Sequence, residues 1–588
     1  MEPTRLFDLL PRYAKKYNKP DMLAIKVNGE WKKYSSDEVT EDANLISYAL
    51  FEMGLQSGDH ISIISNNRPE WVMVNMGMME AGCINVPIYP TISLHDLIFI
   101  LNDAEVKYVF VSDQLLYDKV KEAVKQVPFV KGIISFDTLP GVTNWNTLLE
   151  SGRNFPDKNR MEFIKDTIGA HDVATIIYTS GTTGNPKGVM LSHNNLLTNA
   201  MAQETAIDWH EDWRVLSFLP LNHVFERMLT VLYLYKGLSI YYAESMDKIG
   251  DNIKEVKPHC FATVPRLLEK VYEKIIGKGN EQKGIKKILF FWALNLGLRY
   301  ELNGANGWFY ELQLKIANAL VFNKWREALG GNIVAIISGG AALQPRLARV
   351  FNAARIPVLE GYGLTETSPV IAVNTFEPNA MCFGTVGPVI KNVQVKINEE
   401  GEILVKGPNV MLGYYKNEAE TNKTIIDGWL HTGDIGEMVE GHFLKITDRK
   451  KEIFKTSGGK YIAPQPIENV LKQSPFIEQA MVVGEGQKFP GALIVPAFGH
   501  LKEWCHIKNI PYESDEAMIN LSKVKDRIWQ EVEGVNKNLS HFEMIKKIEL
   551  VDRDWTIEKD ELTPKLSLKR KAIAKNFAAK INSIYTVK

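Results

Sequence analysis

The chain has 588 residues, of which 45% are hydrophobic and 24% are charged, and its formal net charge at pH 7 is −1. This composition is typical of a soluble globular protein, and the length predicts two or more domains. The near-neutral charge provides no global basic field, which argues against nucleic acid as a partner. Scattered cysteines without metal-ligand spacing indicate reduced thiols in a cytosolic protein (Cys83, Cys260, Cys382 and Cys505).

The amino terminus and the apolar runs bear on targeting. Residues 1–22 lack the apolar region and cleavage site of a signal peptide. No apolar run reaches the ~18 residues of a spanning helix. The nearest, "ILFFWALNLGL" at 288–298, is flanked by basic residues, and we interpret it as a buried helix, with shallow membrane contact as the alternative. We therefore expect a cytoplasmic protein, with peripheral contact at the inner face of the membrane left open.

The amino-terminal part alternates strand-like and helix-like segments. Strands are predicted over residues 59–65, 106–113 and 131–136, and helices over residues 69–82 and 114–127. Further along, helix and strand patterns resume and include an apolar strand before "SGG" at residues 338–340. This alternation predicts a mostly parallel sheet that is covered by helices.

A glycine-rich loop, "YTSGTTGNPKG" at residues 178–188, follows the apolar run "VATII". Its glycines permit tight turns whose backbone N–H groups converge on an anion, its hydroxyls add donors, and Lys187 adds a positive charge. It is not a Walker A loop, because Lys187 lies between Pro186 and Gly188. A flexible surface loop is the alternative. We interpret it as a phosphate cradle of another kind.

Two later segments, "SGGAAL" at 338–343 and "EGYGLTET" at 360–367, each follow an apolar strand and are expected to open a turn. The ends of parallel strands are where α/β proteins usually bind ligands. In the second segment, Tyr362 offers a face for a base, Thr365 a hydroxyl for phosphate, and Glu366 a carboxylate for Mg²⁺. Taken alone, such a tyrosine is more often a core or rim aromatic than a base-stacking residue.

From about residue 380 the pattern changes to short alternating runs broken by glycine, as in "VQVKINEEGEILVKGPNVMLGYY" at 393–415, which predicts a small β subdomain. Asp434 in "GWLHTGD" is expected after a glycine turn, where it could hold both ribose hydroxyls or serve only as a turn residue. The segment 448–460 adds Arg449, Lys451 and Lys455, although such a basic run is usually a solvated face.

Five segments together resemble the signature motifs of the adenylate-forming (AMP-binding) superfamily, which includes acyl-CoA synthetases, luciferases and adenylation domains of peptide synthetases. They are "YTSGTTGNPKGVMLSH", "LPLNHVFER", "EGYGLTET", "GWLHTGD" and "DRKKEIFKTSGGKYIAP". The resemblance extends over nearly the whole chain and, within the superfamily, looks most like long-chain fatty acyl-CoA synthetases. It implies an α/β fold with a large N-terminal domain (1–448) of mostly parallel sheets, helices and a small β subdomain. A smaller α+β C-terminal lid (449–588), hinged near Lys451, is expected to follow.

The resemblance implies a ligase that uses ATP and Mg²⁺, with coenzyme A as co-substrate. The carboxylate of a medium- to long-chain fatty acid attacks the α-phosphate of ATP, giving acyl-adenylate and pyrophosphate, and the thiol of coenzyme A then displaces AMP. The alternatives are a fatty acyl-AMP ligase that delivers to a carrier protein or an oxidative enzyme, and a non-catalytic nucleotide-binding relative. A membrane-anchored structural protein is disfavoured because a span is lacking. The partners are thus small molecules, with a homodimer as one candidate assembly.

The resemblance also implies residue roles, with nucleotide between the two domains. The loop from Thr179 to Lys187 contacts phosphates, residues 339–341 wall the adenine, and Tyr362 stacks on it. His223 lies near the substrate carboxylate, and Val264 and Pro265 line the acyl tunnel. The expected catalytic residues are Lys187, His223, Thr365, Glu366, Lys455, Lys565 and Lys569, with Glu366 as metal ligand. The expected nucleotide-binding residues are Thr179, Ser180, Gly181, Thr182, Thr183, Gly184, Lys187, Gly339, Gly340, Ala341, Glu360, Gly361, Tyr362, Gly363, Thr365, Asp434 and Arg449, the pair Asp434 and Arg449 on the ribose.

One position departs from the family pattern. Ser567 stands where the superfamily has a C-terminal lysine that enters the site during adenylation, but Lys565 and Lys569 each lie two residues away. Residues i and i+2 of an extended segment point to the same side. We therefore predict that Lys565 or Lys569 substitutes, the alternative being that both are surface charges and adenylation is impaired.

Overall fold

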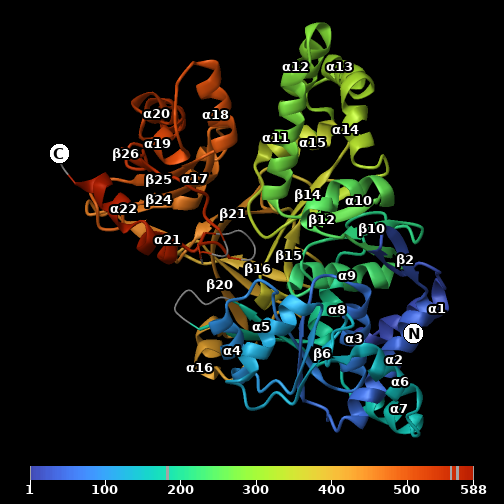
Figure 1. Cartoon of the computed structure of the whole chain (residues 1–588). Helices are drawn as coiled ribbons and strands as arrows, with labels where there is room; N and C mark the ends of the chain where they lie inside the picture. Colours follow the sequence, from blue (N-terminus) through green and yellow to red (C-terminus); the bar gives the residue numbers. More distant parts are fainter. Residues whose placement is uncertain (1, 180–184, 557–558, 560, 564–567, 587–588) are drawn as a thin grey trace. The chain divides into compact units, whose positions relative to one another are not determined.

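The computed structural model describes residues 2–179, 185–556, 559, 561–563 and 568–586. Contacts within the chain divide it into two compact units (Figure 1). The first comprises residues 1–396, 404–431 and 438–445, and the second comprises residues 397–403, 432–437 and 446–588. The boundary between residues 448 and 449 stays a prediction, because the two units interleave along the chain between residues 396 and 446.

The first unit contains two eight-stranded sheets. One has the order β15-β14-β13-β12-β10-β11-β1-β2, in which neighbours from β14 to β1 are parallel and the edge strands β15 and β2 are antiparallel. Every residue of β11, β12 and β13 is buried, as expected of parallel strands covered on both faces. The strands are β1 (Leu23–Val27), β2 (Glu30–Tyr34), β10 (Arg214–Ser217), β11 (Ser239–Tyr242), β12 (Cys260–Thr263), β13 (Ala335–Ser338), β14 (Val358–Gly363) and β15 (Val370–Val373).

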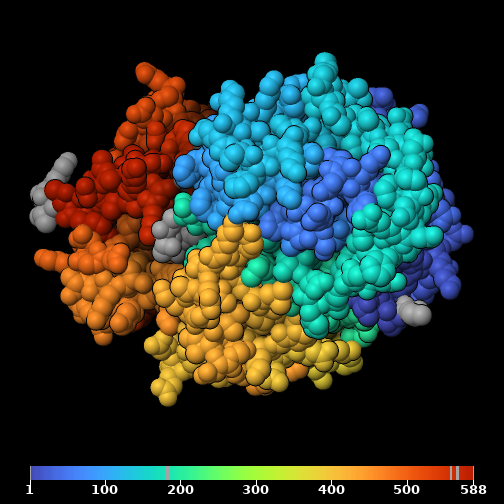
Figure 2. Space-filling model, turned by 90° about the horizontal axis from the view of Figure 1, so that it is seen from below, coloured from blue at the N-terminus to red at the C-terminus, as the bar shows by residue number. Residues whose placement is uncertain are grey.

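The other sheet has the order β18-β9-β8-β4-β3-β5-β6-β7. It is parallel from β8 to β7, whereas β8, β9 and β18 pair antiparallel. Helices α4 (Leu94–Asp103) and α5 (Gln114–Val124) pack together beside it and form part of the light-blue surface in Figure 2. The strands are β3 (His60–Ile64), β4 (Ile84–Pro87), β5 (Tyr108–Val111), β6 (Gly132–Ser135), β7 (Thr143–Asn144), β8 (Val173–Thr179), β9 (Lys187–Ser192) and β18 (Gly413–Tyr414).

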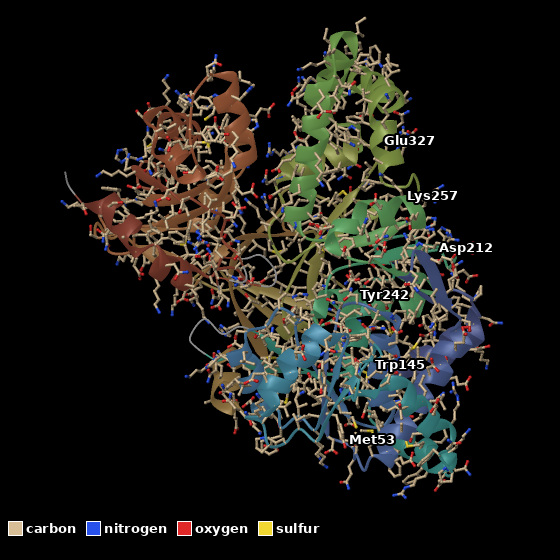
Figure 3. All side chains as sticks on the ribbon, in the orientation of Figure 1. Met53, Trp145, Asp212, Tyr242, Lys257 and Glu327 are labelled. Carbon is tan, nitrogen blue, oxygen red and sulfur yellow. The ribbon has the colours of Figure 1, made fainter. Side chains whose placement is uncertain are left out.

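The core of the first unit encloses whole helices. Helix α3 (Pro69–Glu80) is apolar around most of its circumference, and all of its residues are buried against α2 (Ser36–Glu52) and other elements. Helix α9 (Val224–Lys236) packs against α8 (His193–Met201) and is almost as fully buried. The large aromatic side chains Trp145 and Tyr242, labelled in Figure 3, are buried in the same core. One hydrophobic core thus extends from the first helices to β15.

The second unit has its own sheet, of order β24-β25-β26, with β24 antiparallel and β26 parallel to β25. Separate apolar clusters hold its helices on this sheet. With the first unit, this arrangement confirms the predicted α/β fold with a smaller α+β domain. Its main elements are β22 (Phe454–Lys455), β23 (Tyr461–Ile462), α17 (Pro464–Leu471), β24 (Ile477–Val483), β25 (Gly491–Pro496), α18 (Phe498–Ile507), α20 (Ser522–Asn536), β26 (Lys547–Leu550), α21 (Arg570–Asn576) and α22 (Ala578–Tyr585).

A five-stranded sheet follows residue 390, in the region predicted as a small β subdomain. Its order is β16-β17-β20-β19, with β21 beside β20. The prediction is wrong for residues 413–414 of the segment 393–415. These residues form β18, which pairs with β9 in the second eight-stranded sheet. The strands are β16 (Gln394–Ile397), β17 (Glu402–Lys406), β19 (Ile425–Ile426), β20 (Trp429–Val439) and β21 (Phe443–Arg449).

The apolar run at 288–298 lies in α12 (Gly284–Leu298), which packs against α11 (Pro265–Glu281) and α13 (Trp308–Ala317). The second half of α12 is largely buried, as predicted, but its first turn is exposed. Among the described residues, the helices are all too short or too polar to cross a bilayer.

Candidate active site

Strands β8 and β9, which flank the glycine-rich segment in the sequence, pair as an antiparallel hairpin. Thr179 lies opposite Lys187 in the antiparallel register, and Ser180, Gly181, Thr182, Thr183 and Gly184 lie outside the described residues. Only a glycine fits at position 188, because a Cβ there would lie 2.8 Å from Ile176 Cγ2. Gly188 thus leaves room for the Ile176 and Tyr178 side chains of the paired strand β8.

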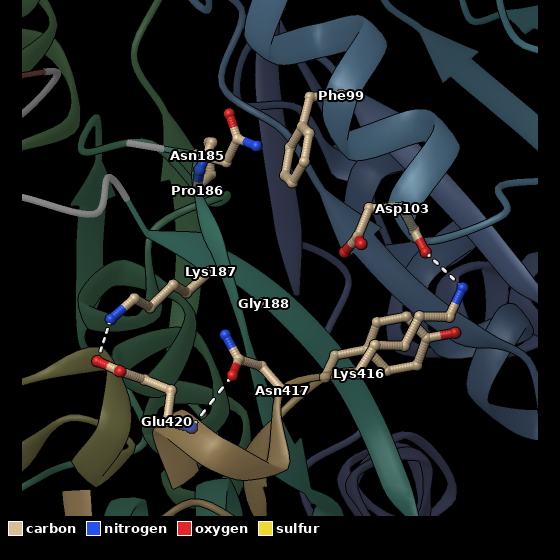
Figure 4. Close-up of a pocket in the computed structure, with 10 residues that line it drawn as sticks. Phe99, Asp103, Asn185, Pro186, Lys187, Gly188, Lys416, Asn417 and Glu420 are labelled. Carbon is tan, nitrogen blue, oxygen red and sulfur yellow. Dashed lines mark hydrogen bonds and ion pairs between the residues drawn. The ribbon is translucent and has the colours of Figure 1, made fainter. Parts of the chain in front are cut away.

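A cavity of about 350 Å³ opens beside this hairpin (Figure 4). The Lys187 ammonium forms an ion pair with Glu420 in α16 (Glu418–Thr424), and it lies 5.4 Å from the ring centre of Tyr414. Both charged side chains are about one quarter exposed or less. The lining residues are Phe99, Asp103, Asn185, Pro186, Lys187, Gly188, Tyr415, Lys416, Asn417 and Glu420.

Tyr414 also contacts the predicted metal ligand. Its hydroxyl donates a hydrogen bond of 3.0 Å to Glu366 Oε1, and burial together with the Glu366 carboxylate raises the pKa of Tyr414. The backbone carbonyl of Glu366 accepts from the Met411 N–H at 2.9 Å. Thr365 is buried next to it in the short helix η5 (Thr365–Thr367). One tyrosine therefore lies between a cation suited to phosphate and a carboxylate suited to Mg²⁺.

The predicted adenine wall and tunnel residues meet at the carboxyl ends of β12 and β13. The Gly339 N–H donates to the Thr263 carbonyl at 3.2 Å, and a Cβ on Gly339 would lie 3.2 Å from the Phe225 ring. Gly340 has a φ of +82° and approaches Val264, whose neighbour Pro265 begins α11. Ala341 follows in an exposed turn. The structure thus brings these predicted residues together.

The segment 360–363 is a strand rather than the expected turn. Gly361, Tyr362 and Gly363 belong to β14 and pair with β15, and the turn begins only at residue 364. The reason is a close backbone contact, since a Cβ on Gly363 would lie 1.8 Å from the Pro369 carbonyl oxygen. Glu360 is buried and accepts a 2.8 Å hydrogen bond from the Leu343 N–H, and burial raises its pKa to about 8.

His223 occupies the N-cap of α9, where its Nδ1 accepts from the Phe225 N–H at 3.2 Å. Two asparagines that the sequence reading missed hold the preceding loop. Asn67 donates to the Leu219 carbonyl at 2.7 Å and accepts from the Leu221 N–H at 3.0 Å. Asn222 donates to the Ile88 carbonyl at 2.6 Å. The position of Asn67 just after strand β3 could have identified it as a site residue. Polar residues at the carboxyl ends of parallel strands gather at one edge of the sheet.

The same motif continues into two fully buried charged residues. Arg227 donates to Asn75 Oδ1 at 2.7 Å and to Thr175 Oγ1 at 2.8 Å, and burial lowers its pKa to about 9. Burial raises the pKa of Glu226 to about 8, and a hydrogen bond with Ser217 only partly offsets this. These residues brace α9 within the core.

In the second unit, Asp434 and Arg449 already contact each other. Asp434 is buried, and its Oδ1 accepts from Arg449 Nε at 3.0 Å. Asp434 lies inside β20 rather than after a turn, because β20 continues through Gly433, which has a φ of +71°. Lys450 forms a 3.0 Å ion pair with Glu402, so this part of the basic run is not simply a solvated face.

The predicted lid lysines are found in separate elements. Lys455 lies in β22, with its ammonium 5.3 Å from the Tyr461 ring centre, and Lys451 is exposed. Lys569 precedes α21, and its N–H donates to the Glu561 carbonyl at 2.8 Å. Lys565 and Ser567 lie outside the described residues.

Two family models match the chain: "AMP-binding enzyme" over residues 13–415 and "AMP-binding enzyme C-terminal domain" over residues 451–588. The chain is 33% identical to the long-chain-fatty-acid–CoA ligase FadD15 of Mycobacterium bovis, covering 95% of this chain and 93% of that one. It is 33% identical to the peroxisomal long chain acyl-CoA synthetase 6 of Arabidopsis thaliana, with coverages of 95% and 82%. Its fold is similar to the adenylation domain of a carboxylate reductase from Mycobacterium chelonae, with a TM-score of 0.78, 19% identity and coverages of 99% and 91%.

Proposed function

Since the chain belongs to the family of AMP-binding enzymes, we propose that it activates a medium- to long-chain fatty acid with ATP and transfers the acyl group to coenzyme A. The names of the full-length relatives support the substrate class. The structural observation that carries the proposal is the arrangement around Tyr414. Its ring faces Lys187, and its hydroxyl binds Glu366, so groups for an anion and for a metal ion adjoin each other.

In the first half-reaction, a carboxylate oxygen of the fatty acid attacks the α-phosphorus and pyrophosphate leaves. This step needs in-line positioning and stabilisation of negative charge more than covalent catalysis. Lys187 supplies a cation after exchanging Glu420 for phosphate, and Thr365 supplies a hydroxyl. We propose that Tyr362 and residues 339–341 bind the adenine, while Asp434 and Arg449 bind the ribose.

The residues present fit a bound Mg²⁺. This ion is usually held by one or two carboxylates together with substrate phosphates, and Glu366 provides one carboxylate. Within the described part of the chain, no group of three or more His, Cys, Asp or Glu side chains could form an all-protein metal site. When bound, Mg²⁺ would neutralise charge on the polyphosphate.

In the second half-reaction, the thiol of coenzyme A attacks the acyl carbonyl and AMP leaves. We propose that His223, held at the N-cap of α9, lies beside the acyl carboxylate in both steps, and that Val264 and Pro265 line the acyl tunnel. The lid, residues 449–588 with a hinge near Lys451, excludes water during each step.

Lys565 or Lys569 is proposed to replace the missing family lysine, with Lys455 as a further cation of the lid. Lys565→Ala or Lys569→Ala should slow acyl-adenylate formation, because a cationic donor to developing phosphorane charge is worth ~3 kcal/mol elsewhere. The thioester step from supplied acyl-adenylate should be unchanged, which single-turnover assays of each half-reaction measure. If neither substitution alters adenylation, this assignment is wrong. A sharp rate gain in Ser567→Lys would show that the natural enzyme works without this cation.

The test of the proposed function is pyrophosphate release with a series of acids from acetate to stearate. We expect several medium and long chains to react, since an apolar slot discriminates by only ~1–3 kcal/mol per methylene. Best activity on acetate or amino acids would refute the substrate class. Formation of pyrophosphate and acyl-adenylate, with no release of AMP when coenzyme A is added, would favour the acyl-AMP ligase. No turnover with any acid would favour a nucleotide-binding relative.

We also propose a cytoplasmic enzyme with peripheral membrane contact. The four cysteines, which are all free thiols, support a reducing compartment. Light scattering on the purified chain tests whether it forms a homodimer.

A further inference from the structure

Helix α13 and the short π-helix η4 (Asn318–Phe322) that follows it present an apolar stripe to solvent. Trp308 and Phe309 are 79% and 60% exposed, and Leu312, Ile316 and Leu320 are each about half exposed. The spacing of three to four residues from 309 to 320 places these side chains along one helical face. The opposite face, with Tyr310, Leu314 and Ala317, is buried. Helix α13 therefore has two apolar faces, and only one of them packs against other residues of the described chain.

The first turn of α12 adds a second exposed apolar group among lysines. Ile285 and Ile288 are 75% and 70% exposed, and Lys286 and Lys287 lie between them. Residues 278–288 contain four lysines and one glutamate, although the whole chain has a net charge of −1. Helices α12 and α13 pack against each other and project from the sheets of the first unit (Figure 1).

This clustering distinguishes the surface from the rest of the first unit. Single exposed apolar side chains, such as Leu115 on α5 and Phe163 on α7 (Lys158–Thr167), are normal on soluble proteins. A group of large apolar side chains on two adjacent helices marks an interaction site instead. The excess of lysine around Ile285 and Ile288 is the feature that selects the partner, because it complements negative charge.

We propose that this surface, defined as Ile285, Ile288, Trp308, Phe309, Leu312 and Ile316 with the adjacent lysines, docks on an anionic lipid bilayer. Trp308 and Phe309 would enter the headgroup boundary, while lysine ammonium groups contact lipid phosphates. The inference deepens the peripheral contact proposed above. Only the biological role of the docking rests on the proposed function: a bilayer would supply the poorly soluble fatty acid.

Cosedimentation of the full chain with vesicles tests the proposal. The vesicles contain phosphatidylcholine with about 30% phosphatidylglycerol, or phosphatidylcholine alone. The test variant is Trp308→Ser with Phe309→Ser, and the matched control is Leu115→Ser with Phe163→Ser, whose exposed fractions of 79% and 70% are similar. We expect the wild-type chain and the control to bind anionic vesicles, and the test variant to bind at least tenfold more weakly.

A second variant, Lys286→Gln with Lys287→Gln, tests the electrostatic part, and its binding should be weaker and less sensitive to salt. Pyrophosphate release with octanoate in the absence of lipid should be unchanged in all variants, so failure of docking is distinguishable from failure of the proposed enzyme function. The proposal is overturned if the wild-type chain ignores anionic vesicles, or binds both vesicle types equally. It is also overturned if light scattering shows that Trp308→Ser with Phe309→Ser converts a dimer to a monomer, which would identify a second copy as the occupant.

Discussion

Two charged clusters of the first unit differ in how their charges are held. Arg227 in the core has fixed neutral partners, Asn75 and Thr175, and is fully buried. Lys187 at the hairpin is partly exposed beside a cavity, and its carboxylate partner Glu420 is equally accessible. Removing the partner of a buried charge destabilises the fold, because the charge cannot reach water. An accessible charge can exchange its partner for a ligand at little cost in stability. Both clusters derive from motif segments, yet only the accessible one can bind a substrate.

The largest effect is expected in the core. Arg227→Met should lower the free energy of unfolding by about 3 kcal/mol, because two buried hydrogen bonds from a charged donor are lost. Asn75 Oδ1 would still accept from Asn85, and Thr175 Oγ1 would still donate to the Asn85 carbonyl. Urea unfolding monitored by circular dichroism measures this. A loss below about 1 kcal/mol would contradict the assignment of this cluster to stability.

The hairpin should respond in the opposite way. Lys187→Ala should reduce kcat/KM for pyrophosphate formation about 100-fold, since one preorganised donor to transition-state charge is worth about 2.7 kcal/mol or more. Its free energy of unfolding should change by less than about 0.5 kcal/mol. Lys416→Ala, which removes another lysine of the same cavity, is the control and should retain activity. Equal losses of kcat/KM in Lys187→Ala and Lys416→Ala would show that Lys187 has no special role among the lysines of the cavity.

The buried carboxyl of Glu226 predicts a pH dependence of stability. Its pKa is raised from 4.5 to about 8, so the folded chain holds a proton that the unfolded chain has released. The stability from this group is complete below pH 4.5 and is lost as the pH rises to 8, at up to about 1.4 kcal/mol per pH unit. Glu226→Gln should flatten the curve of unfolding free energy between pH 5 and 8. Identical curves for the variant and the wild-type chain would show that Glu226 does not carry this proton.

The smallest of these effects concerns Tyr414. Tyr414→Phe keeps the ring beside Lys187 but removes the hydrogen bond to Glu366. The Mg²⁺ concentration for half-maximal pyrophosphate release should rise about tenfold, since partners that orient a metal ligand typically contribute that much. Tyr415→Phe is the matched control and should leave the Mg²⁺ requirement unchanged. An unchanged requirement in Tyr414→Phe as well would argue that Glu366 does not hold the metal ion.

Periodicity was sufficient for much of the first unit. The predicted segments at 59–65, 69–82 and 114–127 contain β3, α3 and α5, because each is apolar on every face or along one clear stripe. The glycine-rich loop and the segment after β13 were also placed correctly at strand ends. These features depend on local sequence alone.

What could not be predicted depends on contacts between distant segments. Tyr362 and Asp434 lie within strands because β15 pairs with β14 and because β20 continues through Gly433. No local pattern shows that Asn222 binds the backbone after β4, or that Glu420 would face Lys187. Such pairings are decided by packing across the fold rather than by the residues on either side.

The pairing of β18 with β9 bears on how the chain is made. Lys187 and Glu420 are 233 residues apart, and β18 lies just before Glu420. A ribosome that adds ~5–20 residues per second therefore needs roughly 10 to 50 s to deliver the strand that covers β9. During that interval the nascent hairpin presents an open edge, which is the kind of surface that pairs with the wrong strand. The yield of folded protein should thus depend on how fast translation crosses this interval and on chaperones that shield β9 meanwhile.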